Sequence, residues 1–210
     1  KVMTKIKKIF YGLFFCLFFT FFLNSQQNNF YWENEQVLES GKIGKFEVIN
    51  NNKIVGVLGV ENSKNREIFL RYSFDGINWQ PRMVLVNDFY SNNPNGVDYS
   101  GVIDNLNNLF VCFRTTPNKL VIEKFGFDSS VASGKFQKGE RIFEIESQDI
   151  IYLPSLFATT QNEICLTYLE NTNKDVKIKF VKINGTGKSL INRSLEDSYK
   201  SQLNPYMAES

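Results

Sequence analysis

The strongest constraint on the fold is a segment that recurs at a constant spacing. The recurring stretches are NNKIVGVLGV (51–60), NNLFVCFRTT (107–116) and NEICLTYLE (162–170). When Ile54, Leu109 and Ile164 are aligned, the steps are 109 − 54 = 55 and 164 − 109 = 55 residues. Self-similarity at a fixed period of this size is the signature of a repeat architecture.

Each repeat contains four short extended runs, separated by clusters of Asn, Gly, Asp and Ser. The runs are rich in β-branched and aromatic residues, and several alternate apolar with polar residues, as half-buried strands do. The predicted strands are 45–49, 53–60, 67–73 and 81–86; then 99–103, 108–113, 119–125 and 141–145; then 152–158, 163–169, 175–183 and 188–191. Four short strands per repeat predict an all-β fold, a β-propeller fragment with three four-stranded antiparallel blades at about 45–86, 99–145 and 152–191.

The two ends of the sequence extend the same pattern. YWENEQVL (31–38) matches NWQPRMVL (78–85), and LNPYMA (203–208) matches LPSLFA (153–158). We therefore expect a single strand at each end, the second one starting a further blade at 203–210. Because a lone strand exposes an unpaired edge, the sequence is expected to be part of a longer propeller, with six blades as the expected parent.

The first 25 residues have the pattern of a signal peptide. Four lysines precede an apolar run at 9–23, and the sequence turns polar after Asn24-Ser25. The run has 23 − 9 + 1 = 15 residues, fewer than the ~20 that a spanning helix needs. An uncleaved membrane anchor is the alternative. We expect 1–25 to be removed and 26–210 to be secreted, periplasmic or on the cell surface.

Charge and composition narrow the classes of function. The formal net charge of +2 becomes 2 − 4 = −2 once the four lysines of 1–25 are removed, so no nucleic-acid surface is predicted. We expect no membrane contact beyond the signal peptide. The sequence has no histidine, which excludes Ser-His-Asp and Cys-His catalysis and histidine-ligated zinc. We expect no metal and no cofactor.

Two cysteines, Cys112 and Cys165, lie in the predicted propeller. They stand three residues and one residue after the aligned positions Leu109 and Ile164, so both are expected on the same side of equivalent strands. Neighbouring blades meet with opposite sides. The cysteines are therefore predicted to be small buried hydrophobes, not a disulfide.

The segment SFDGINW (73–79) predicts a tight turn between the third and fourth strands of the first blade. Gly76 can adopt the positive φ that such turns need, and Asp75 can accept hydrogen bonds from the amides that follow. Ser73 ends the preceding strand. Trp79 is larger than a turn requires, and we expect it to be wedged against the adjoining blade.

This segment resembles the Asp box, the S-x-D-x-G-x-x-W turn of bacterial neuraminidase repeats (BNR repeats), with one residue fewer between Asp75 and Gly76. Traces of the same turn stand at Phe127-Asp128, with Gly134-Lys135-Phe136, and at INGTG (183–187). The resemblance implies a sialidase-like propeller, related in fold to glycoside hydrolases. In that family the box is a structural turn far from the catalytic face.

The resemblance also implies where catalytic residues would stand. Sialidases hold the substrate carboxylate with three arginines and use a tyrosine nucleophile beside a glutamate, with an aspartate as acid and base. The first arginine belongs to an F/Y-R-I-P motif on the first strand of the opening blade. Here that strand reads KFEVI (45–49) and has no arginine. FRTTP (113–117) is only superficially similar and ends a second strand, so no catalytic residue is assigned.

Ligands of propellers usually meet the loops that join the last strand of one blade to the first strand of the next. Here those loops are 87–98, 146–151 and 192–202. Aromatic faces stack on sugar rings, and carboxylates accept bonds from hydroxyls; an ordinary solvated loop is the alternative. The candidate ligand-binding residues are Asp88, Phe89, Tyr90, Asp98, Tyr99, Arg114, Glu146, Asp149 and Tyr152.

Three functions fit these observations. The leading prediction is an exported, sialidase-like propeller that binds glycans or another extracellular partner. The second is the N-terminal part of an exo-α-sialidase, and the third is a structural or protein-interaction propeller. The missing first arginine favours the first and third. The sequence does not indicate the oligomeric state.

Overall fold

The computed structural model describes six stretches of the chain, and all of them belong to one compact unit, Leu38–Ser210. The described residues are 43–61, 66–87, 89–91, 98–130, 134–172 and 175–195. Every regular element in these stretches is a β-strand, which confirms the predicted all-β fold. Within them there is no helix with the length and apolarity to cross a bilayer. The predicted signal peptide and the predicted strands at 31–38 and 203–208 lie outside the described residues.

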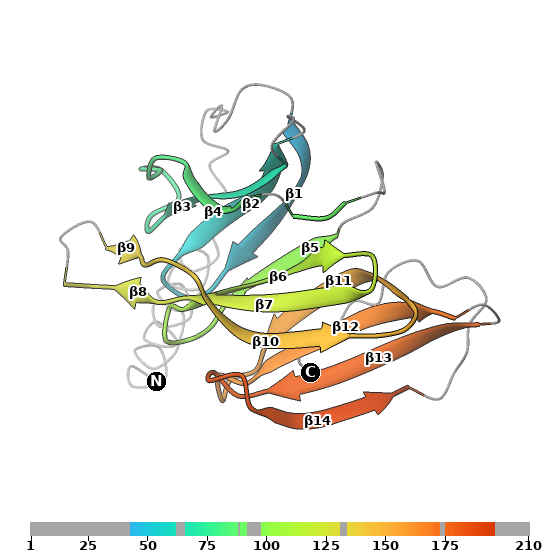
Figure 1. Cartoon of the computed structure of the whole chain (residues 1–210). Helices are drawn as coiled ribbons and strands as arrows, with labels where there is room; N and C mark the ends of the chain where they lie inside the picture. The colour runs from blue at the N-terminus through green and yellow to red at the C-terminus, as the bar shows by residue number, and fades with distance from the viewer. Residues whose placement is uncertain are drawn as a thin grey trace, which may run out of the picture. The chain divides into compact units, whose positions relative to one another are not determined.

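The strands form three four-stranded antiparallel sheets that follow one another in chain order (Figure 1). Sheet 1 consists of β1 (Ile43–Asn50), β2 (Val55–Glu61), β3 (Glu67–Ser73) and β4 (Met83–Val86). Sheet 2 consists of β5 (Tyr99–Ile103), β6 (Leu109–Thr116), β7 (Lys119–Phe125) and β10 (Glu140–Glu146). Sheet 3 consists of β11 (Ile150–Ala158), β12 (Ile164–Asn171), β13 (Val176–Ile183) and β14 (Ser189–Ser194). These are the four strands per repeat that the sequence predicts.

The three aligned apolar positions all lie at the start of a second strand or directly before it. Leu109 and Ile164 begin β6 and β12, and Ile54 directly precedes β2. All three side chains are buried. The 55-residue period therefore corresponds to the second strands of consecutive sheets, as a propeller-like fragment requires.

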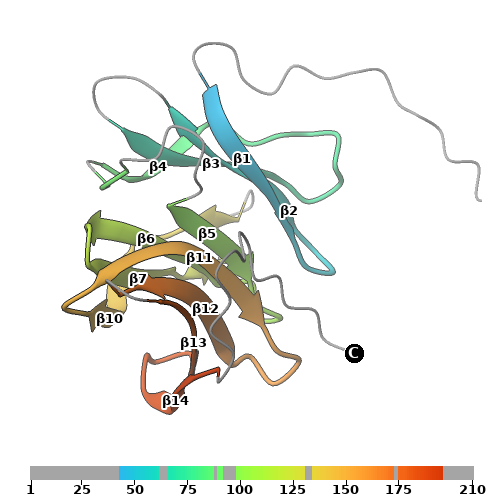
Figure 2. The same ribbon diagram turned by 90° about the vertical axis from the view of Figure 1, so that its right-hand side faces the viewer.

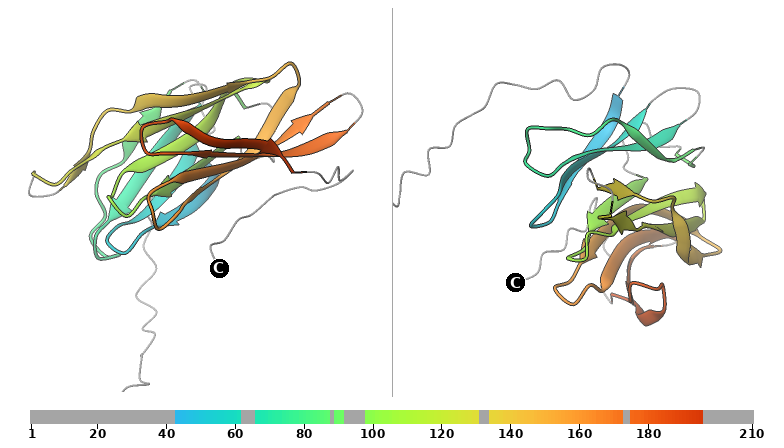
Figure 3. Two further views of the ribbon diagram at one scale, coloured as in Figure 1. Left: turned by 90° about the horizontal axis from the view of Figure 1, so that it is seen from below. Right: turned by 90° about the vertical axis from the view of Figure 1, so that its left-hand side faces the viewer.

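A short hairpin interrupts the second repeat between β7 and β10. It consists of β8 (Phe127–Asp128) and β9 (Lys135–Phe136), and it projects beyond the ends of the sheet 2 strands (Figure 3). This hairpin was not among the predicted strands, because two residues per strand are too few to show a periodic pattern.

Sheet 2 is buried on both faces, because alternate residues of a strand point to opposite sides. Leu109, Val111 and Phe113 of β6 pack with sheet 1, whereas Phe110 and Cys112 pack with sheet 3. This explains why β6 is continuously apolar instead of alternating. Complete burial of one such side chain contributes about 1.5–3 kcal/mol. Figure 2 shows the first strands of the three sheets, β1, β5 and β11, following one another.

The cysteines lie as predicted. Cys112 faces sheet 3, whereas Cys165 points away from sheet 2 because its neighbours Ile164 and Leu166 take the facing side. No disulfide joins the two thiols, and both are buried. Burial raises the pKa of the Cys112 thiol, and the charge of Glu47 adds to this.

Candidate functional site

The predicted turn at 73–79 is closed by the Asp75 carboxylate. Its Oδ1 accepts hydrogen bonds from the Ile77 amide (2.9 Å), the Asn78 amide (2.7 Å) and the Ser73 hydroxyl (2.8 Å). The bonds from Asn78, followed by those from Ile77 and Ser73, hold the pKa of Asp75 well below its usual range. Gly76 has a φ of 75°. The turn is thus satisfied by its own atoms and has a structural role.

Trp79 lies elsewhere than expected. Its side chain is only partly buried, and its Nε1 donates to a carbonyl of the same turn at 3.1 Å. The seam between sheets 1 and 2 is filled instead by edge-to-face contacts among Tyr72, Phe74, Phe127 and Phe136. Two of these rings come from the β8–β9 hairpin. Rings of the inserted hairpin therefore fill the seam in which Trp79 was expected to be wedged.

The corresponding turns of the second and third repeats are also closed by a side-chain oxygen that accepts from a following amide. Asp128 Oδ1 accepts from the Ser130 amide at 2.9 Å, and Asn184 Oδ1 accepts from the Lys188 amide at 2.8 Å. Gly187 has a φ of 85°, and a Cβ there would collide with a backbone carbonyl of sheet 2. The two incomplete copies of the motif therefore keep its turn chemistry.

Three of the predicted ligand-binding residues meet in a buried cluster. Arg114 Nη1 lies 2.8 Å from Asp98 Oδ1, and both side chains are 2% exposed. The guanidinium carbon lies 4.8 Å from the centre of the Tyr90 ring, and Nη2 donates to the Pro117 carbonyl at 3.0 Å. The Tyr90 amide donates to the Arg114 carbonyl at 2.8 Å. Arg114 thus ties the loop after β4 to β6.

Two buried polar atoms of this cluster have no partner within the described part of the chain. Among the described residues, neither Arg114 Nε nor Asp98 Oδ2 has a hydrogen-bond partner. Asp88, which was predicted to share this loop site, lies outside the described residues. Because the guanidinium is buried against Asp98, it is not accessible to a substrate carboxylate from solvent.

Phe89 and Tyr99 belong to the core between sheets 1 and 2. Both are buried, with their ring centres 6.4 Å apart. The Tyr99 hydroxyl donates to the Lys45 carbonyl at 2.6 Å. Burial and then the charge of Glu47 raise the pKa of Tyr99. The structure thus places these two candidates in packing roles.

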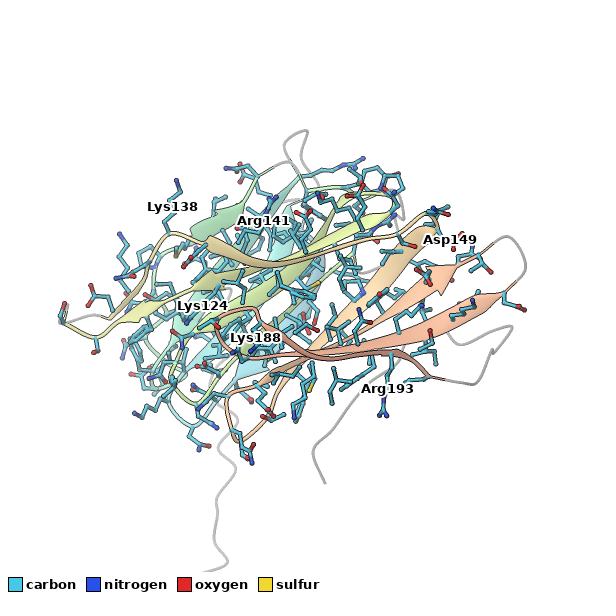
Figure 4. All side chains as sticks on the ribbon, turned by 60° about the horizontal axis from the view of Figure 1, so that its bottom comes forward. Lys124, Lys138, Arg141, Asp149, Lys188 and Arg193 are labelled. Carbon is cyan, nitrogen blue, oxygen red and sulfur yellow. The ribbon has the colours of Figure 1, made fainter. Side chains whose placement is uncertain are left out.

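The remaining candidates lie around the loop from β10 to β11. Glu146 is exposed, with Oε2 3.8 Å from Lys119 Nζ. The amide of Asp149, a residue labelled in Figure 4, donates to the hydroxyl oxygen of Ser147 at 3.1 Å. Tyr152 is partly buried, and this burial raises its pKa. These groups take part in local contacts that shape the loop.

A cavity of about 330 Å³ opens among the first strands of the three sheets. Its polar lining consists of Glu47, Asn50, Asn51, Asn52, Asn105 and Thr159. The volume falls in the range of about 300–1,000 Å³ that is typical of small-molecule sites. Sequence reasoning missed this cavity because it considered the loops at the other ends of the first strands. The asparagine-rich turns that follow β1 and β5 are the signal that could have found it.

Glu47 is the acidic group of this cavity. Its Oε1 accepts from the Ser100 hydroxyl at 3.0 Å, and its Oε2 accepts from the Gly101 amide at 2.9 Å. Burial raises the pKa of Glu47, and these two bonds offset part of the rise. A carboxylate has about four lone-pair sites, so both oxygens can accept further bonds from a ligand.

Comparisons with known proteins assign no family. No protein-family model matches the sequence, and no curated protein matches it. A solved structure described as "Glycoside hydrolase" aligns with 78% of this chain at 11% identity and a TM-score of 0.32. The alignment covers 50% of that structure's chain, so this chain spans about half its length. A likeness at this TM-score carries no assignment of function.

Proposed function

We propose that residues 26–210 form an exported, sialidase-like propeller fragment that binds a carbohydrate in the cavity among β1, β5 and β11. The observation that carries the proposal is the chemistry of this cavity, which combines the Glu47 carboxylate with several amide side chains. Export rests on the signal-peptide pattern of the sequence.

The lining suits a ligand that presents many hydroxyl groups. Amide side chains both donate and accept hydrogen bonds, and the carboxylate of Glu47 accepts them. Asn50 is exposed at the cavity, and Phe157 and Ala158 supply apolar surface beside it. A few convergent polar groups on an apolar wall are typical of small-molecule sites.

The groups that line the cavity favour carbohydrate binding over glycoside hydrolysis. Glycoside hydrolysis typically uses two carboxyl groups, about 5–5.5 Å apart for retention or about 6.5–9.5 Å apart for inversion. Among the described residues that line the cavity, Glu47 supplies the one carboxylate. Recognition needs only hydrogen bonds and apolar contact, so we propose binding and not hydrolysis for this cavity.

The test is a glycan array probed with residues 26–210, followed by titration calorimetry with the best ligand. Ala158 lines the cavity and packs against the core beneath it, so Ala158→Phe should abolish binding in a variant whose circular dichroism matches that of the parent. Asn50→Ala removes one hydrogen-bonding side chain and should weaken binding about fivefold, from a loss of about 1 kcal/mol.

Tyr90→Ala is the matched control, because Tyr90 belongs to the loop that the sequence predicted as the site. Unchanged binding in this variant, with loss in Ala158→Phe, supports the cavity. Binding that is lost in Tyr90→Ala and kept in Ala158→Phe would refute the cavity and return the site to the loop.

A further inference from the structure

The first strands of the three sheets can be aligned on the turns that follow them. In each sheet a side-chain oxygen caps that turn, and the three capping residues are Asn51, Asp104 and Thr159. Counting back four positions from each cap gives three equivalent residues on β1, β5 and β11, which are Glu47, Ser100 and Ser155. The cavity residue Glu47 therefore stands where the two other sheets have a serine.

A hydrogen bond between sheets shows the structural task of this position. The Leu156 amide of sheet 3 donates to the hydroxyl oxygen of Ser100 in sheet 2 at 3.0 Å. One sheet earlier, the Gly101 amide of sheet 2 donates to Glu47 Oε2 of sheet 1 at 2.9 Å. Leu156 and Gly101 directly follow two equivalent residues, Ser155 and Ser100, so the two bonds are copies of each other. The task is to accept one amide of the next sheet.

A serine hydroxyl is sufficient for this task, as Ser100 shows. Glu47 brings two features that the task does not use, a negative charge and a second oxygen. That second oxygen, Oε1, accepts from the Ser100 hydroxyl at 3.0 Å. Because each carboxylate oxygen has two lone-pair sites, both oxygens can accept a further donor. The excess over the structural task points to a second role for Glu47.

The charge of Glu47 has no cationic partner within the described stretches. The groups that donate to it, a hydroxyl and a backbone amide, are both neutral. None of the ion pairs formed between described residues includes it. The side chain is partly buried, and this burial raises its pKa. Since a desolvated charge without a counter-charge is costly, a ligand that supplies a cation gains the most at this carboxylate.

The cavity presents this charge to a ligand. The described residues that line it include no lysine and no arginine, so Glu47 sets the sign of the charge there. The exposed side chains of Asn50 and Asn52 supply amide groups that suit hydroxyls. An acidic sugar would bring a second carboxylate close to Glu47 and be repelled, whereas an amine would be attracted.

We propose that Glu47 makes the cavity selective for an amino sugar, a carbohydrate whose free amine is protonated. The ammonium group would donate to the unused lone pairs of the Glu47 carboxylate. Charge-assisted hydrogen bonds of this kind are about twice as strong as neutral ones. The inference rests on the proposed carbohydrate-binding function and names the class of ligand for that cavity. Sialic acid, the ligand that the resemblance of the sequence implies, carries a carboxylate and would be disfavoured by the same charge.

The test compares two oligosaccharides that differ only at nitrogen, the trimers of glucosamine and of N-acetylglucosamine. Titration calorimetry is run at a pH at which the amine is protonated and Glu47 is ionised. The glucosamine trimer should bind about tenfold more tightly, which corresponds to about 1.4 kcal/mol. The acidic trimer of galacturonic acid should bind more weakly than either.

Glu47→Gln removes the charge and keeps an oxygen for the Gly101 amide. In this variant the two trimers should bind within about twofold of each other, while the circular dichroism matches that of the parent. Glu140→Gln is the matched control, because Glu140 is exposed on β10, lies outside the cavity lining and changes the net charge equally. It should keep the full preference. The comparison isolates one carboxylate, whatever further walls a longer chain adds to the cavity.

The outcomes separate this inference from the proposed function. Suppose that both trimers bind and Ala158→Phe abolishes their binding, but the parent binds N-acetylglucosamine as tightly as glucosamine. That result would overturn the inference and leave carbohydrate binding intact. A preference for glucosamine that survives in Glu47→Gln would overturn it as well, because Glu47 would not be the cause. No binding of any carbohydrate would refute the proposed function, and the inference with it.

Discussion

Replacing Asp98 with alanine leaves a charged guanidinium buried without its carboxylate. Arg114 and Asp98 are each 2% exposed and 2.8 Å apart, so water has little access to either group. Removing one member of a buried ion pair costs about 3–5 kcal/mol, because the other charge stays desolvated. The variant tests whether this cluster, predicted as a ligand site, holds the fold.

The contacts that remain set the expected magnitude. In the variant Arg114 keeps its bond to the Pro117 carbonyl at 3.0 Å and its stacking on Tyr90 at 4.8 Å. Such contacts contribute about 1.5–3 and about 0.5–2 kcal/mol. We therefore expect the lower end of the range, about 3 kcal/mol. For a domain of about 185 residues this lowers Tm by roughly 6–12 °C.

The assay is urea unfolding followed by circular dichroism, with the m-value as a check on two-state behaviour. The double variant Asp98→Leu/Arg114→Met should unfold within about 1 kcal/mol of the parent, because it leaves no unpaired charge. An Asp98→Ala variant within about 0.5 kcal/mol of the parent would refute the reasoning. So would a double variant less stable than the single one.

Three further predictions address the turns, the cavity and the thiols. Gly76→Ala should lower the free energy of unfolding by about 1–2 kcal/mol, because the residue has a positive φ. Gly187→Ala should lower it by about 1–3 kcal/mol more, because the added Cβ would also collide with sheet 2. Equal losses of Tm in the two variants would contradict this. Burial raises the pKa of Glu47 above its usual 4.5, so the folded state favours the protonated form, and that contribution is lost as pH rises through the raised pKa. As pH rises from 4.5 through the raised pKa, the parent should therefore lose stability that Glu47→Gln does not lose. The difference in unfolding free energy between variant and parent should change by at most about 1.4 kcal/mol per pH unit, and a difference that is constant with pH would contradict this prediction. Cys112 and Cys165 should react with a thiol reagent only after unfolding, whereas rapid labelling of the native chain would show that they are exposed.

The strands could be predicted because their signal is local. Alternation, β-branched residues and turn residues mark each strand, and the 55-residue period sets the order of the sheets. The β8–β9 hairpin was not predicted, because strands of two residues are too short to show alternation. The position of Trp79 was not predicted for a related reason: Phe127 and Phe136 of the inserted hairpin fill the space between sheets 1 and 2.

The candidate site was harder to predict because residue types do not reveal their partners. An arginine and an aspartate near aromatic residues suit both a ligand site and a buried ion pair. Only the register of β5 on β6 shows that Arg114 and Asp98 are paired. The cavity depends on Glu47 of β1 and on Asn105 and Thr159, which lie in the turns after β5 and β11. No local window of sequence contains that juxtaposition.

Consecutive sheets are joined by a repeated hydrogen bond from a first-strand amide to a side-chain oxygen of the preceding sheet. The Gly101 amide donates to Glu47, and the Leu156 amide donates to the hydroxyl oxygen of Ser100. Hydrogen exchange resolved by NMR at Gly101 and Leu156 tests this claim most directly. Both amides should be protected, and Glu47→Ala should speed exchange at Gly101 about fivefold or more while Leu156 stays protected. Rapid exchange of both amides in the parent, or no change at Gly101 in the variant, would contradict the account.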